Sequence, residues 1–325
     1  MAEKVFVTHE LPGEGTRKLA QHCDLTIWPG PGLLSAAGLR DSLADCQGLV
    51  CLLTDRIDRE LLEALPDLEF VSSMSVGVDH IDVRALSERG IPVGHTPGVL
   101  VDTTADAAFA LLLAAARRLG EADRFIRAGK WRPENAWSPE FFVGKEVTAA
   151  TLGIVGLGAI GQAVARRAAG FGMRVLSWSR SAREVQGVEP VALEELLSLS
   201  DFVSVHVALT EETRDLLDAD KIAMMKPGAV LVNTARGGIV DEHALARALV
   251  SGHVYAAGID VFAQEPVAMD NPLLRHPRVV VAPHIGSATM LTRAKMADLA
   301  VDNALAALQG RAMRYCVNPE VYASP

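Results

Sequence analysis

The stretch Thr151–Gly161 constrains the fold more than any other part of the sequence. It reads TLGIVGLGAIG, an apolar run followed by Gly156, Gly158 and Gly161. This order predicts a buried strand, a tight turn and a helix that continues through Gln162–Ala169. One glycine permits the turn, one lets a pyrophosphate approach the backbone, and one lets the helix pack on the strand. Because a helix N-terminus binds phosphate through its unpaired N–H groups, we predict a dinucleotide site here.

Composition limits the class of protein and its partners. The chain has 325 residues, of which 50% are hydrophobic and 22% charged, which suffices for two globular domains. Its net charge of −9 provides no basic field, so we expect neither nucleic acid nor a membrane as a partner. The first residues lead directly into a predicted strand without a signal peptide, and the longest apolar run, near Ala107–Ala116, is too short to span a bilayer. We therefore expect a cytoplasmic protein.

The four cysteines form no pattern typical of a metal or redox site. Cys46 and Cys51 lie near each other in sequence, but no C-x-x-C pair and no histidine at ligand spacing accompanies them. We expect small, buried side chains in a reducing compartment, and we predict no metal site.

Short apolar runs alternate with helical patterns along two parts of the chain. The strands predicted in the first part are Val5–Thr8, Leu25–Trp28, Leu49–Thr54, Phe70–Met74 and Ile91–Gly94, with helices within Leu33–Leu43, Asp58–Leu65 and Val83–Arg89. Those predicted in the second part are Gly153–Val155, Arg174–Trp178, Phe202–Val207, Ala229–Asn233, Ala256–Val261 and Val279–Ala282. Such alternation predicts parallel sheets covered by helices on both faces.

This pattern predicts an α/β protein with two Rossmann-like, doubly wound domains and an active site in the cleft between them. Residues 103–285 would form the dinucleotide-binding domain. Residues 1–102 and 286–325 would form a discontinuous substrate-binding domain, because a long amphipathic helix, about Met290–Leu308, is expected to return to the first part.

A predicted helix around Ala107–Ala116 is apolar on nearly every side and must be buried. The segment Thr103–Asp106 is similar to a capping box at its start, and Arg117, Arg118 and Gly120 suit its end, with glycine as the left-handed residue. The helix could lie between the two domains or in a subunit interface. We expect both, and hence a homodimer.

The residues after the second strand of the cofactor domain predict the coenzyme. NAD-binding chains of this type carry an acid at the strand end, which binds the ribose 2′-hydroxyl. Here Ser179, Arg180 and Ser181 occupy this place. No carboxylate would repel a 2′-phosphate and Arg180 can bind one, so we predict NADPH, with NADH weaker. The alternative is that Arg180 is an ordinary surface arginine.

Three residues that suit the reduction of a 2-oxo acid each follow a predicted strand. They are Arg236, Glu265 and His284. The guanidinium can bind a carboxylate and polarise the adjacent carbonyl. The imidazolium can donate a proton to the carbonyl oxygen, and the carboxylate can orient the imidazole and raise its pKa.

Each of these three residues also has an ordinary structural explanation. Arg236 could be a cation at a helix end, Glu265 a solvated loop acid, and His284 a core histidine. Because ligands bind at the carboxyl ends of parallel strands, their shared placement favours a catalytic site.

At these residues the chain resembles the D-isomer-specific 2-hydroxyacid dehydrogenases, and within them most closely the glyoxylate/hydroxypyruvate reductases. The resemblance spans almost the whole length. The matching segments are 50–59, 72–83, 95–107, 156–168, 233–239, 258–267 and 283–290. The last three place the family's arginine, glutamate and histidine at Arg236, Glu265 and His284.

The resemblance implies further site residues. Substrate would contact the backbone of Val76 and Gly77, whose alternative role is a simple turn, and Ser287, whose alternative role is a helix N-cap. Asp260 would contact the nicotinamide amide, or merely cap a turn. Trp137, or else Trp131, would reach the active site of the neighbouring subunit. The other positions expected to bind cofactor are Thr104, Gly156, Gly158, Ala159, Ile160, Gly161, Ala208, Thr234 and Gly286.

The implied reaction is reduction of glyoxylate to glycolate and of hydroxypyruvate to D-glycerate, with hydride from NADPH and His284 as general acid. Phosphoglycerate dehydrogenase is the nearest alternative, but such enzymes often carry an added regulatory domain. Formate dehydrogenases pair the histidine with glutamine rather than with a residue like Glu265. Corepressors of the same fold act as scaffolds and carry long terminal extensions.

Overall fold

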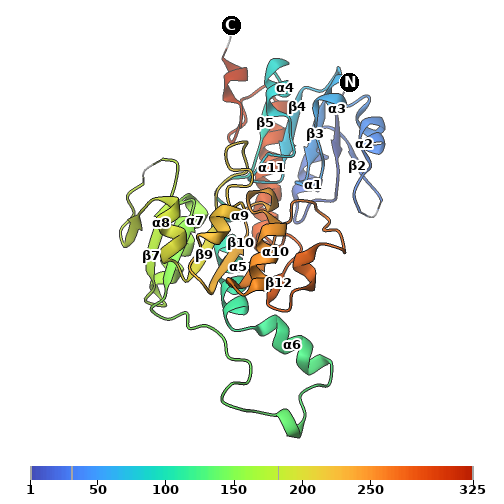
Figure 1. Ribbon diagram of the computed structural model, residues 1–325. Helices are drawn as coiled ribbons and strands as arrows, with labels where there is room; N and C mark the ends of the chain where they lie inside the picture. Colours follow the sequence, from blue (N-terminus) through green and yellow to red (C-terminus); the bar gives the residue numbers. More distant parts are fainter. Residues whose placement is uncertain (1, 31, 182, 324–325) are drawn as a thin grey trace. The chain divides into compact units, whose positions relative to one another are not determined.

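The computed structural model describes residues 2–30, 32–181 and 183–323. The chain divides into two compact units, each built on one parallel sheet. The first unit comprises residues 1–100 and 288–325, and the second comprises residues 101–287. Figure 1 shows both, with the element labels used below.

The first unit contains a five-stranded sheet in the order β2-β1-β3-β4-β5. The strands are β1 (Lys4–Val7), β2 (Asp24–Ile27), β3 (Gly48–Cys51), β4 (Phe70–Ser73) and β5 (Val93–Gly94). The helices are α1 (Gly15–Leu19), α2 (Ala36–Leu43), α3 (Arg59–Glu63), α4 (Val83–Glu88) and α11 (Met290–Leu308). Every residue of β3 and β4 is buried, as expected for a parallel sheet with both faces covered.

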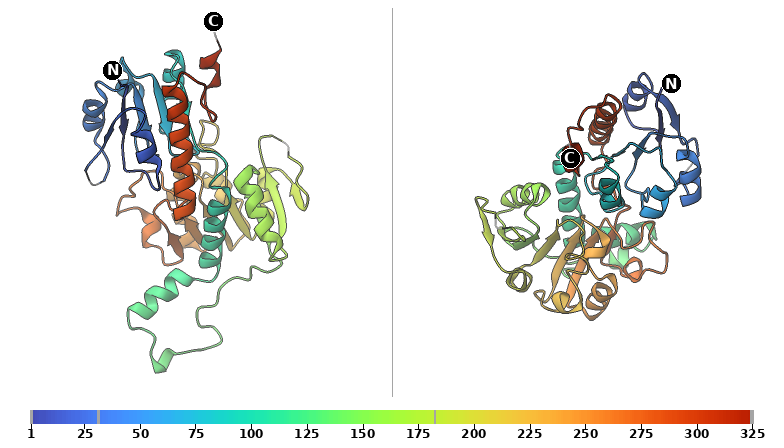
Figure 2. Two further views of the ribbon diagram at one scale, coloured as in Figure 1. Left: turned by 180° about the vertical axis from the view of Figure 1, so that it is seen from behind. Right: turned by 90° about the horizontal axis from the view of Figure 1, so that it is seen from above.

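Helix α11 joins this unit although it follows the second unit in sequence. It packs on β3, β4 and β5 beside α1, and Figure 2 shows it running along the sheet. The Ser72 hydroxyl in β4 donates to the carbonyl of Ala300 in α11 at 2.8 Å. Helices α2, α3 and α4 contribute to a separate apolar core with the strands. The terminal helix therefore completes the cover of the first sheet.

The second unit contains a seven-stranded parallel sheet in the order β12-β11-β10-β9-β6-β7-β8. Its strands are β6 (Thr151–Val155), β7 (Arg174–Trp178), β8 (Val188–Pro190), β9 (Phe202–Val205), β10 (Ala229–Asn233), β11 (Val254–Ile259) and β12 (Val279–Val281). Its helices are α5 (Val101–Ala116), α6 (Leu119–Arg127), α7 (Ala159–Ala169), α8 (Leu193–Leu199), α9 (Ala219–Ala223) and α10 (Glu242–Ser251). Strand order reverses at β6, which pairs with both β7 and β9, so the turn after β6 lies at a topological switch point.

Two apolar cores cover the faces of this second sheet. Helices α5 and α7 contribute to one core, and α8, α9 and α10 to the other. The predicted two-sheet α/β architecture is therefore confirmed. Helix α5 is buried along much of its length within this unit, as its apolar sequence predicts.

Helix α5 ends at Ala116 as expected, but its predicted start and the residue predicted to be left-handed after it are wrong. The helix begins at Val101 rather than near Thr103, so Thr103 lies inside the first turn. At the other end Arg118, not Gly120, takes the left-handed conformation, with φ of 55°. Two guanidinium hydrogen bonds to Glu121, of 2.9 and 2.8 Å, stabilise Arg118 there, and Gly120 is already part of α6.

The sequence interpretation missed several short elements. Strand β8 has three residues, two of them exposed, and it contains Pro190. It is an edge strand, where a missing N–H is tolerated. Helices α1, α6, α8, α9 and α10 were also missed. Helices α1, α8 and α9 are too short for a clear helical period, whereas α6 and α10 are longer and amphipathic and were overlooked.

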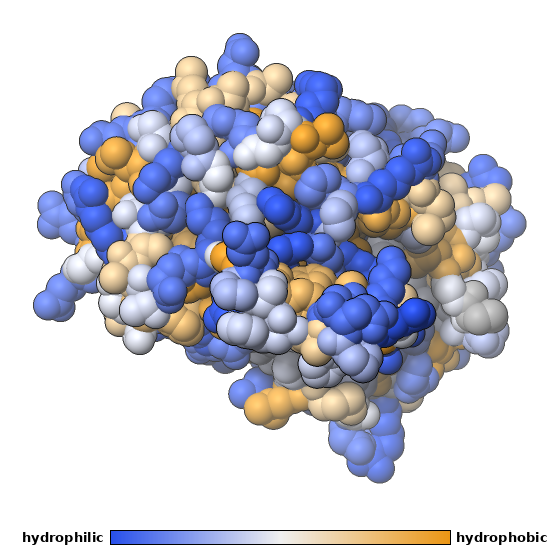
Figure 3. Space-filling view, turned by 60° about the horizontal axis from the view of Figure 1, so that its bottom comes forward, coloured by the Kyte–Doolittle hydropathy of each residue, from blue (hydrophilic) through white to orange (hydrophobic). Residues whose placement is uncertain are grey.

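Helix α6 and the segment up to residue 144 form an arm, which Figure 1 shows extending away from the seven-stranded sheet. Phe125, Phe141 and Phe142 contact one another edge to face within it. Its exposed apolar side chains are Leu119, Ile126, Trp131, Trp137 and Val143. The face shown in Figure 3 likewise carries hydrophobic residues at the surface.

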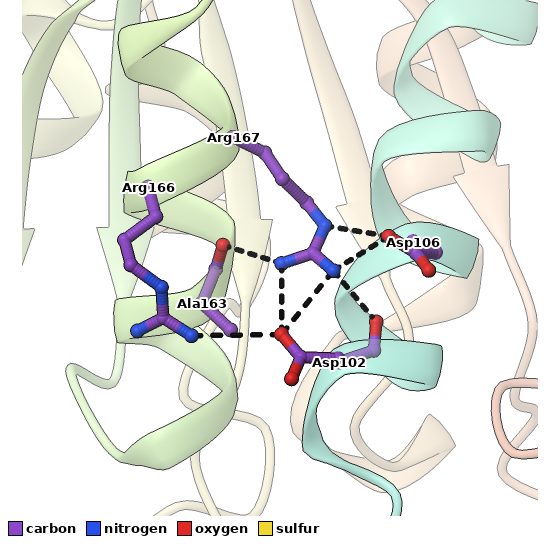
Figure 4. A network of polar contacts seen from close by, with 5 residues as sticks. All are labelled: Asp102, Asp106, Ala163, Arg166 and Arg167. Atoms are coloured by element: carbon purple, nitrogen blue, oxygen red, sulfur yellow. Dashed lines mark hydrogen bonds and ion pairs between the residues drawn. The ribbon is translucent and has the colours of Figure 1, made fainter. Parts of the chain in front are cut away.

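A polar network ties α5 to the glycine-turn helix α7 (Figure 4). The Arg167 guanidinium donates to Asp106 at 2.6 Å, to the Asp102 carboxylate at 3.3 Å and to the Ala163 carbonyl at 2.9 Å. Arg166 reaches Asp102 at 3.5 Å from a more exposed position. Because the Arg167 side chain is only 23% exposed, its hydrogen bonds fix α7 relative to the start of α5.

Candidate active site

The three glycines of the turn after β6 each meet a different geometric need. Gly156 has φ of 103°, and a Cβ there would lie 2.7 Å from the His206 carbonyl carbon. A Cβ on Gly161 would collide with the Gly156 carbonyl oxygen, whereas Gly158 faces open space. Gly158 is the N-cap of α7, so the N–H groups of its first turn, including those of Ala159 and Ile160, lie at an accessible helix start. The turn therefore suits a phosphate.

Ser179 follows β7 and contacts this turn directly. Its hydroxyl oxygen accepts a hydrogen bond from the Leu157 N–H at 2.7 Å. Arg180 is exposed and lies 3.5 Å from the Glu212 carboxylate, which also accepts a bond from Thr210. Sequence reasoning missed Glu212. A 2′-phosphate bound by Arg180 would have to compete with this carboxylate.

Arg236 follows β10 in a segment that its neighbours fix. The buried Asn233 side chain donates to the Arg236 carbonyl at 2.8 Å and accepts from the Ala235 N–H at 3.0 Å. A Cβ on Gly237 would collide with the backbone of Phe262, so glycine is required there. These contacts hold Arg236 next to the loop that follows β11. Asn233 was missed because no motif distinguishes it from an ordinary strand end.

His284 and Glu265 form a hydrogen-bonded pair. The distance from His284 Nδ1 to Glu265 Oε2 is 2.6 Å, and Glu265 Oε1 accepts from the Phe262 N–H at 2.9 Å. His284 has φ of 55°, and its N–H donates to the Asp260 carbonyl at 2.8 Å. Because Glu265 occupies Nδ1, Nε2 is the ring nitrogen that can exchange a proton with a ligand.

The charges around Glu265 determine its protonation. Burial alone would raise its pKa, but the hydrogen bond from His284, the charge of His284, the Phe262 N–H and the charge of Arg236 lower it below the ordinary value of 4.5. Gly237, the residue after Arg236, packs against the backbone of Phe262, whose N–H binds Glu265, so Arg236 lies near this pair. The structure thus brings together the three predicted catalytic residues, at the carboxyl ends of β10, β11 and β12.

Asp260 organises the turn after β12. Its two carboxylate oxygens accept from the N–H groups of Ile285 and Gly286, each at 2.8 Å. A Cβ on Gly286 would lie 3.2 Å from Asp260 and 3.4 Å from the Thr104 side chain, so these predicted cofactor residues are neighbours. Asp260 therefore has the turn-capping role that was its alternative. Each oxygen retains a further lone pair for a ligand.

Thr234 is a predicted cofactor residue whose buried hydroxyl lacks a protein partner. Its Oγ1 has no hydrogen-bond partner among the described residues, and the residue is 8% exposed. A buried hydroxyl without a partner destabilises a protein unless a ligand or water satisfies it.

The remaining predicted positions occupy varied settings. Ala208 is exposed, and its carbonyl accepts from Thr213 at 2.6 Å; Ser181 is also exposed. Ser287 is partly buried and is not a helix N-cap, because Thr289 caps α11. Trp131 donates to the Ala136 carbonyl, whereas Trp137 is 79% exposed. Val76 and Gly77 follow β4 in the first unit.

The described residues contain neither a membrane-spanning helix nor a cluster of metal ligands. No helix among them is long and apolar enough to cross a membrane. Within residues 2–30, 32–181 and 183–323, no group of three His, Cys, Asp or Glu side chains could hold a metal ion. All four cysteines are free thiols, and Cys46 and Cys51 are buried.

Comparison with known proteins identifies the family. The family model described as "D-isomer specific 2-hydroxyacid dehydrogenase, NAD binding domain" matches residues 109–286. The chain belongs to the D-isomer-specific 2-hydroxyacid dehydrogenase family. It is thus an NAD(P)-dependent oxidoreductase that acts on small 2-oxo acids and the corresponding 2-hydroxy acids.

Relatives of this dehydrogenase match it over nearly the full length. A glyoxylate reductase of Korarchaeum cryptofilum is 49% identical over 99% of this chain and 97% of its own. A solved Thermus thermophilus protein is 45% identical, with a TM-score of 0.90, over 97% of this chain and 99% of its own. An NADPH-dependent glyoxylate/hydroxypyruvate reductase of Sinorhizobium meliloti, solved with NADP and malonate, is 32% identical with a TM-score of 0.87, over 98% of each chain.

We predict that Glu265→Gln changes the pH dependence of stability. The folded pKa of Glu265 is lowered, so its ionised form stabilises the fold fully above about pH 4.5. That contribution is lost as pH falls through the lowered pKa. The variant should be less stable by about 1–2 kcal/mol near pH 6, with the difference shrinking in more acidic solution. Urea unfolding across this range measures it.

Glu211→Gln is the control, since Glu211 is an exposed glutamate of the same unit. It should follow the wild-type stability curve. A Glu265→Gln curve parallel to the wild type at every pH would show that the pair with His284 does not stabilise the fold.

Proposed function

We propose that this dehydrogenase reduces glyoxylate to glycolate and hydroxypyruvate to D-glycerate, with NADPH as the preferred coenzyme and NADH weaker. The observation that carries the proposal is the 2.6 Å contact between His284 and Glu265, with Arg236 close enough to act on the same carboxylate. The relatives named glyoxylate reductase support the choice of substrate. The neighbour solved with NADP supports the coenzyme.

The residues around the glycine turn fit a nicotinamide dinucleotide. The open space at Gly158 and the accessible start of α7 would bind the pyrophosphate. The unpartnered Thr234 hydroxyl, after β10, would gain a hydrogen bond to the bound coenzyme. Ser179, Arg180 and Ser181 would hold the adenosine ribose and its 2′-phosphate, while Thr104, Asp260, Ala208 and Gly286 would line the rest of the site. When bound, the coenzyme supplies a hydride to C2 of the substrate.

The chain's own residues would bind the substrate and move a proton. Arg236 binds the substrate carboxylate and polarises the C2 carbonyl through paired N–H donors. His284, charged and held through Nδ1 by Glu265, donates the Nε2 proton to the carbonyl oxygen as hydride adds to carbon. Glu265 fixes the ring and stabilises its positive charge. The product is the 2-hydroxy acid, and His284 regains a proton from solvent.

The other predicted roles belong to the same proposal. The second unit would be the dinucleotide-binding domain and the first the substrate-binding domain. Val76 and Gly77 would bind the substrate carboxylate through backbone N–H groups, and Ser287 would contact the substrate.

The free cysteines agree with a cytoplasmic location. Fractionation of the source cells would test this location. Recovery of the protein in the secreted fraction would contradict it.

We predict that His284→Ala lowers kcat for glyoxylate with NADPH by about 10²–10⁴-fold, the usual contribution of a positioned general acid. Loss of NADPH absorbance with time measures it, and hydroxypyruvate provides a second substrate. His243→Ala is the matched control, because His243 is exposed on α10. Near-normal turnover of the His284 variant would remove the histidine from this role, and an inactive wild type would contradict the proposed substrates.

We predict that Ser179→Asp shifts the coenzyme preference toward NADH. The new carboxylate would still accept from the Leu157 N–H but would repel a 2′-phosphate. The ratio of kcat/KM for NADPH to that for NADH should fall by about tenfold or more, equivalent to ~1.4 kcal/mol. Ser198→Asp, on the exposed side of α8, should leave the ratio unchanged. An unchanged ratio in the Ser179 variant would contradict the coenzyme assignment.

We further propose a homodimer in which Trp137 of each chain reaches the partner's active site. The exposed apolar side chains of the arm support this arrangement. Mass measurement in solution should give twice the chain mass of 34.6 kDa. Mixing Trp137→Ala chains with His284→Ala chains should restore activity, because a hybrid dimer contains one site with both side chains intact.

The same mixing experiment distinguishes the two tryptophans. If Trp131→Ala complements His284→Ala and Trp137→Ala does not, Trp131 is the residue that crosses. A monomer, or the absence of complementation by either variant, would contradict the shared site.

A further inference from the structure

Three consecutive carbonyl groups in the loop after β4 are each bound by a protein donor. The Ser75 carbonyl accepts from the Thr96 N–H at 2.8 Å and from the Thr96 hydroxyl at 3.1 Å. The Val76 carbonyl lies 3.0 Å from His95 Nδ1. The Gly77 carbonyl accepts from the Ser75 hydroxyl at 2.7 Å. Each of the three peptide planes is therefore fixed by a hydrogen bond to its carbonyl group.

The bonds to these carbonyl groups also set the direction of the N–H group in each peptide unit. In a trans peptide the C=O and the following N–H point in opposite directions, so the three bonds also orient the N–H groups of Val76, Gly77 and Val78. None of the three finds an acceptor among the described residues. Val76–Val78 are partly exposed, whereas Ser75 is 3% and Thr96 0% exposed. Unpaired and partly exposed N–H groups of this kind are available to donate to an anion.

His95 is itself held by two distant parts of the first unit. Its N–H donates to the Tyr315 carbonyl at 3.0 Å, and its carbonyl accepts from the Asn303 side chain at 3.0 Å. Asn303 lies in α11 and is completely buried. The Ser75 hydroxyl is likewise 2.7 Å from that of Ser73. The loop therefore rests on side chains that cannot readily move.

We propose that Ser75, His95 and Thr96 are positioning residues that fix the Val76–Val78 N–H groups to bind the carboxylate of a 2-oxo acid. They touch no substrate; they act by holding the peptide planes. The inference rests on the proposed function, in which this loop binds substrate. It adds three side chains whose role is to set substrate affinity rather than the rate of the chemical step.

The test uses the geometric difference between asparagine and glutamine at position 95. The amide nitrogen of Asn occupies the place of His Nδ1, whereas that of Gln occupies the place of Nε2. His95→Asn should retain the bond to Val76 and a near wild-type KM for glyoxylate. His95→Gln should lose it and raise KM, and the inhibition constant of oxalate, by about 3–10-fold, while kcat changes by less than about twofold.

His22→Ala is the matched control, because His22 Nδ1 also contacts a backbone carbonyl, that of Lys18, at 3.0 Å in the same unit. Removing this bond should leave both constants unchanged. Ser75→Ala is a second variant for the case in which substitutions at His95 impair folding. It removes the donor to Gly77 and should raise the same constants.

A spectroscopic readout separates positioning from a general loss of structure. With ¹⁵N-glycine labelling, the Gly77 amide signal, assigned by its absence in Gly77→Ala, should shift when oxalate is added to wild-type protein and to His95→Asn. It should shift only at higher oxalate concentrations in His95→Gln. Wild-type protein that neither reduces glyoxylate nor responds to oxalate would contradict the proposed function. An active wild type with equal KM and equal Gly77 shifts in both His95 variants would overturn this inference alone.

Discussion

The hydrogen bond between His284 and Glu265 is the interaction on which the chemistry proposed for this dehydrogenase depends. At 2.6 Å it joins loops that follow two neighbouring strands, and it determines which nitrogen of the imidazole is available to a substrate. It requires support on both sides. The Phe262 N–H orients the carboxylate, and the Asp260 carbonyl holds the histidine backbone in a left-handed conformation. The lowered pKa of Glu265 keeps this carboxylate ionised in mildly acidic solution.

Parallel strands explain why these groups meet. Neighbouring parallel strands end at the same edge, so residues separated by about 20–30 positions in the chain are brought together there. In the second unit that edge carries Arg236 after β10, Glu265 after β11 and His284 after β12. In the first unit, the carboxyl edge of its own sheet carries the Val76–Val78 loop after β4. In both units, hydrogen bonds from neighbouring residues hold the carbonyl or carboxylate groups of these segments in place.

The sequence predicted the architecture because its signals were strong and repeated. Buried parallel strands such as β6 and β10 read as apolar runs, and glycines between a strand and a helix, as after β6, are typical of a dinucleotide-binding turn. The ends of α5 were harder. Sequence favours glycine in the left-handed conformation, but two bonds from Arg118 to Glu121 outweigh that preference locally.

The proposed catalytic residues could be selected from their position after strands and from the family resemblance, whereas the residues that hold them in place could not. Asn233, Glu212 and His95 act through specific distances to backbone or charged atoms. No spacing rule in one sequence encodes such contacts, because each joins parts of the chain that only the folded structure brings together. Ser287 illustrates the same limit, since the helix cap that was its alternative role is provided by Thr289.

The most direct measurement of the central claim follows the hydride itself. Wild-type protein is incubated with glyoxylate and NADPH carrying deuterium at both C4 positions, and the glycolate is examined by mass spectrometry and NMR. The account predicts one deuterium at C2 of every glycolate formed in ordinary water. Glycolate without deuterium, or with a C2 hydrogen that comes from solvent when the reaction is run in heavy water with unlabelled NADPH, would contradict hydride transfer to a 2-oxo acid.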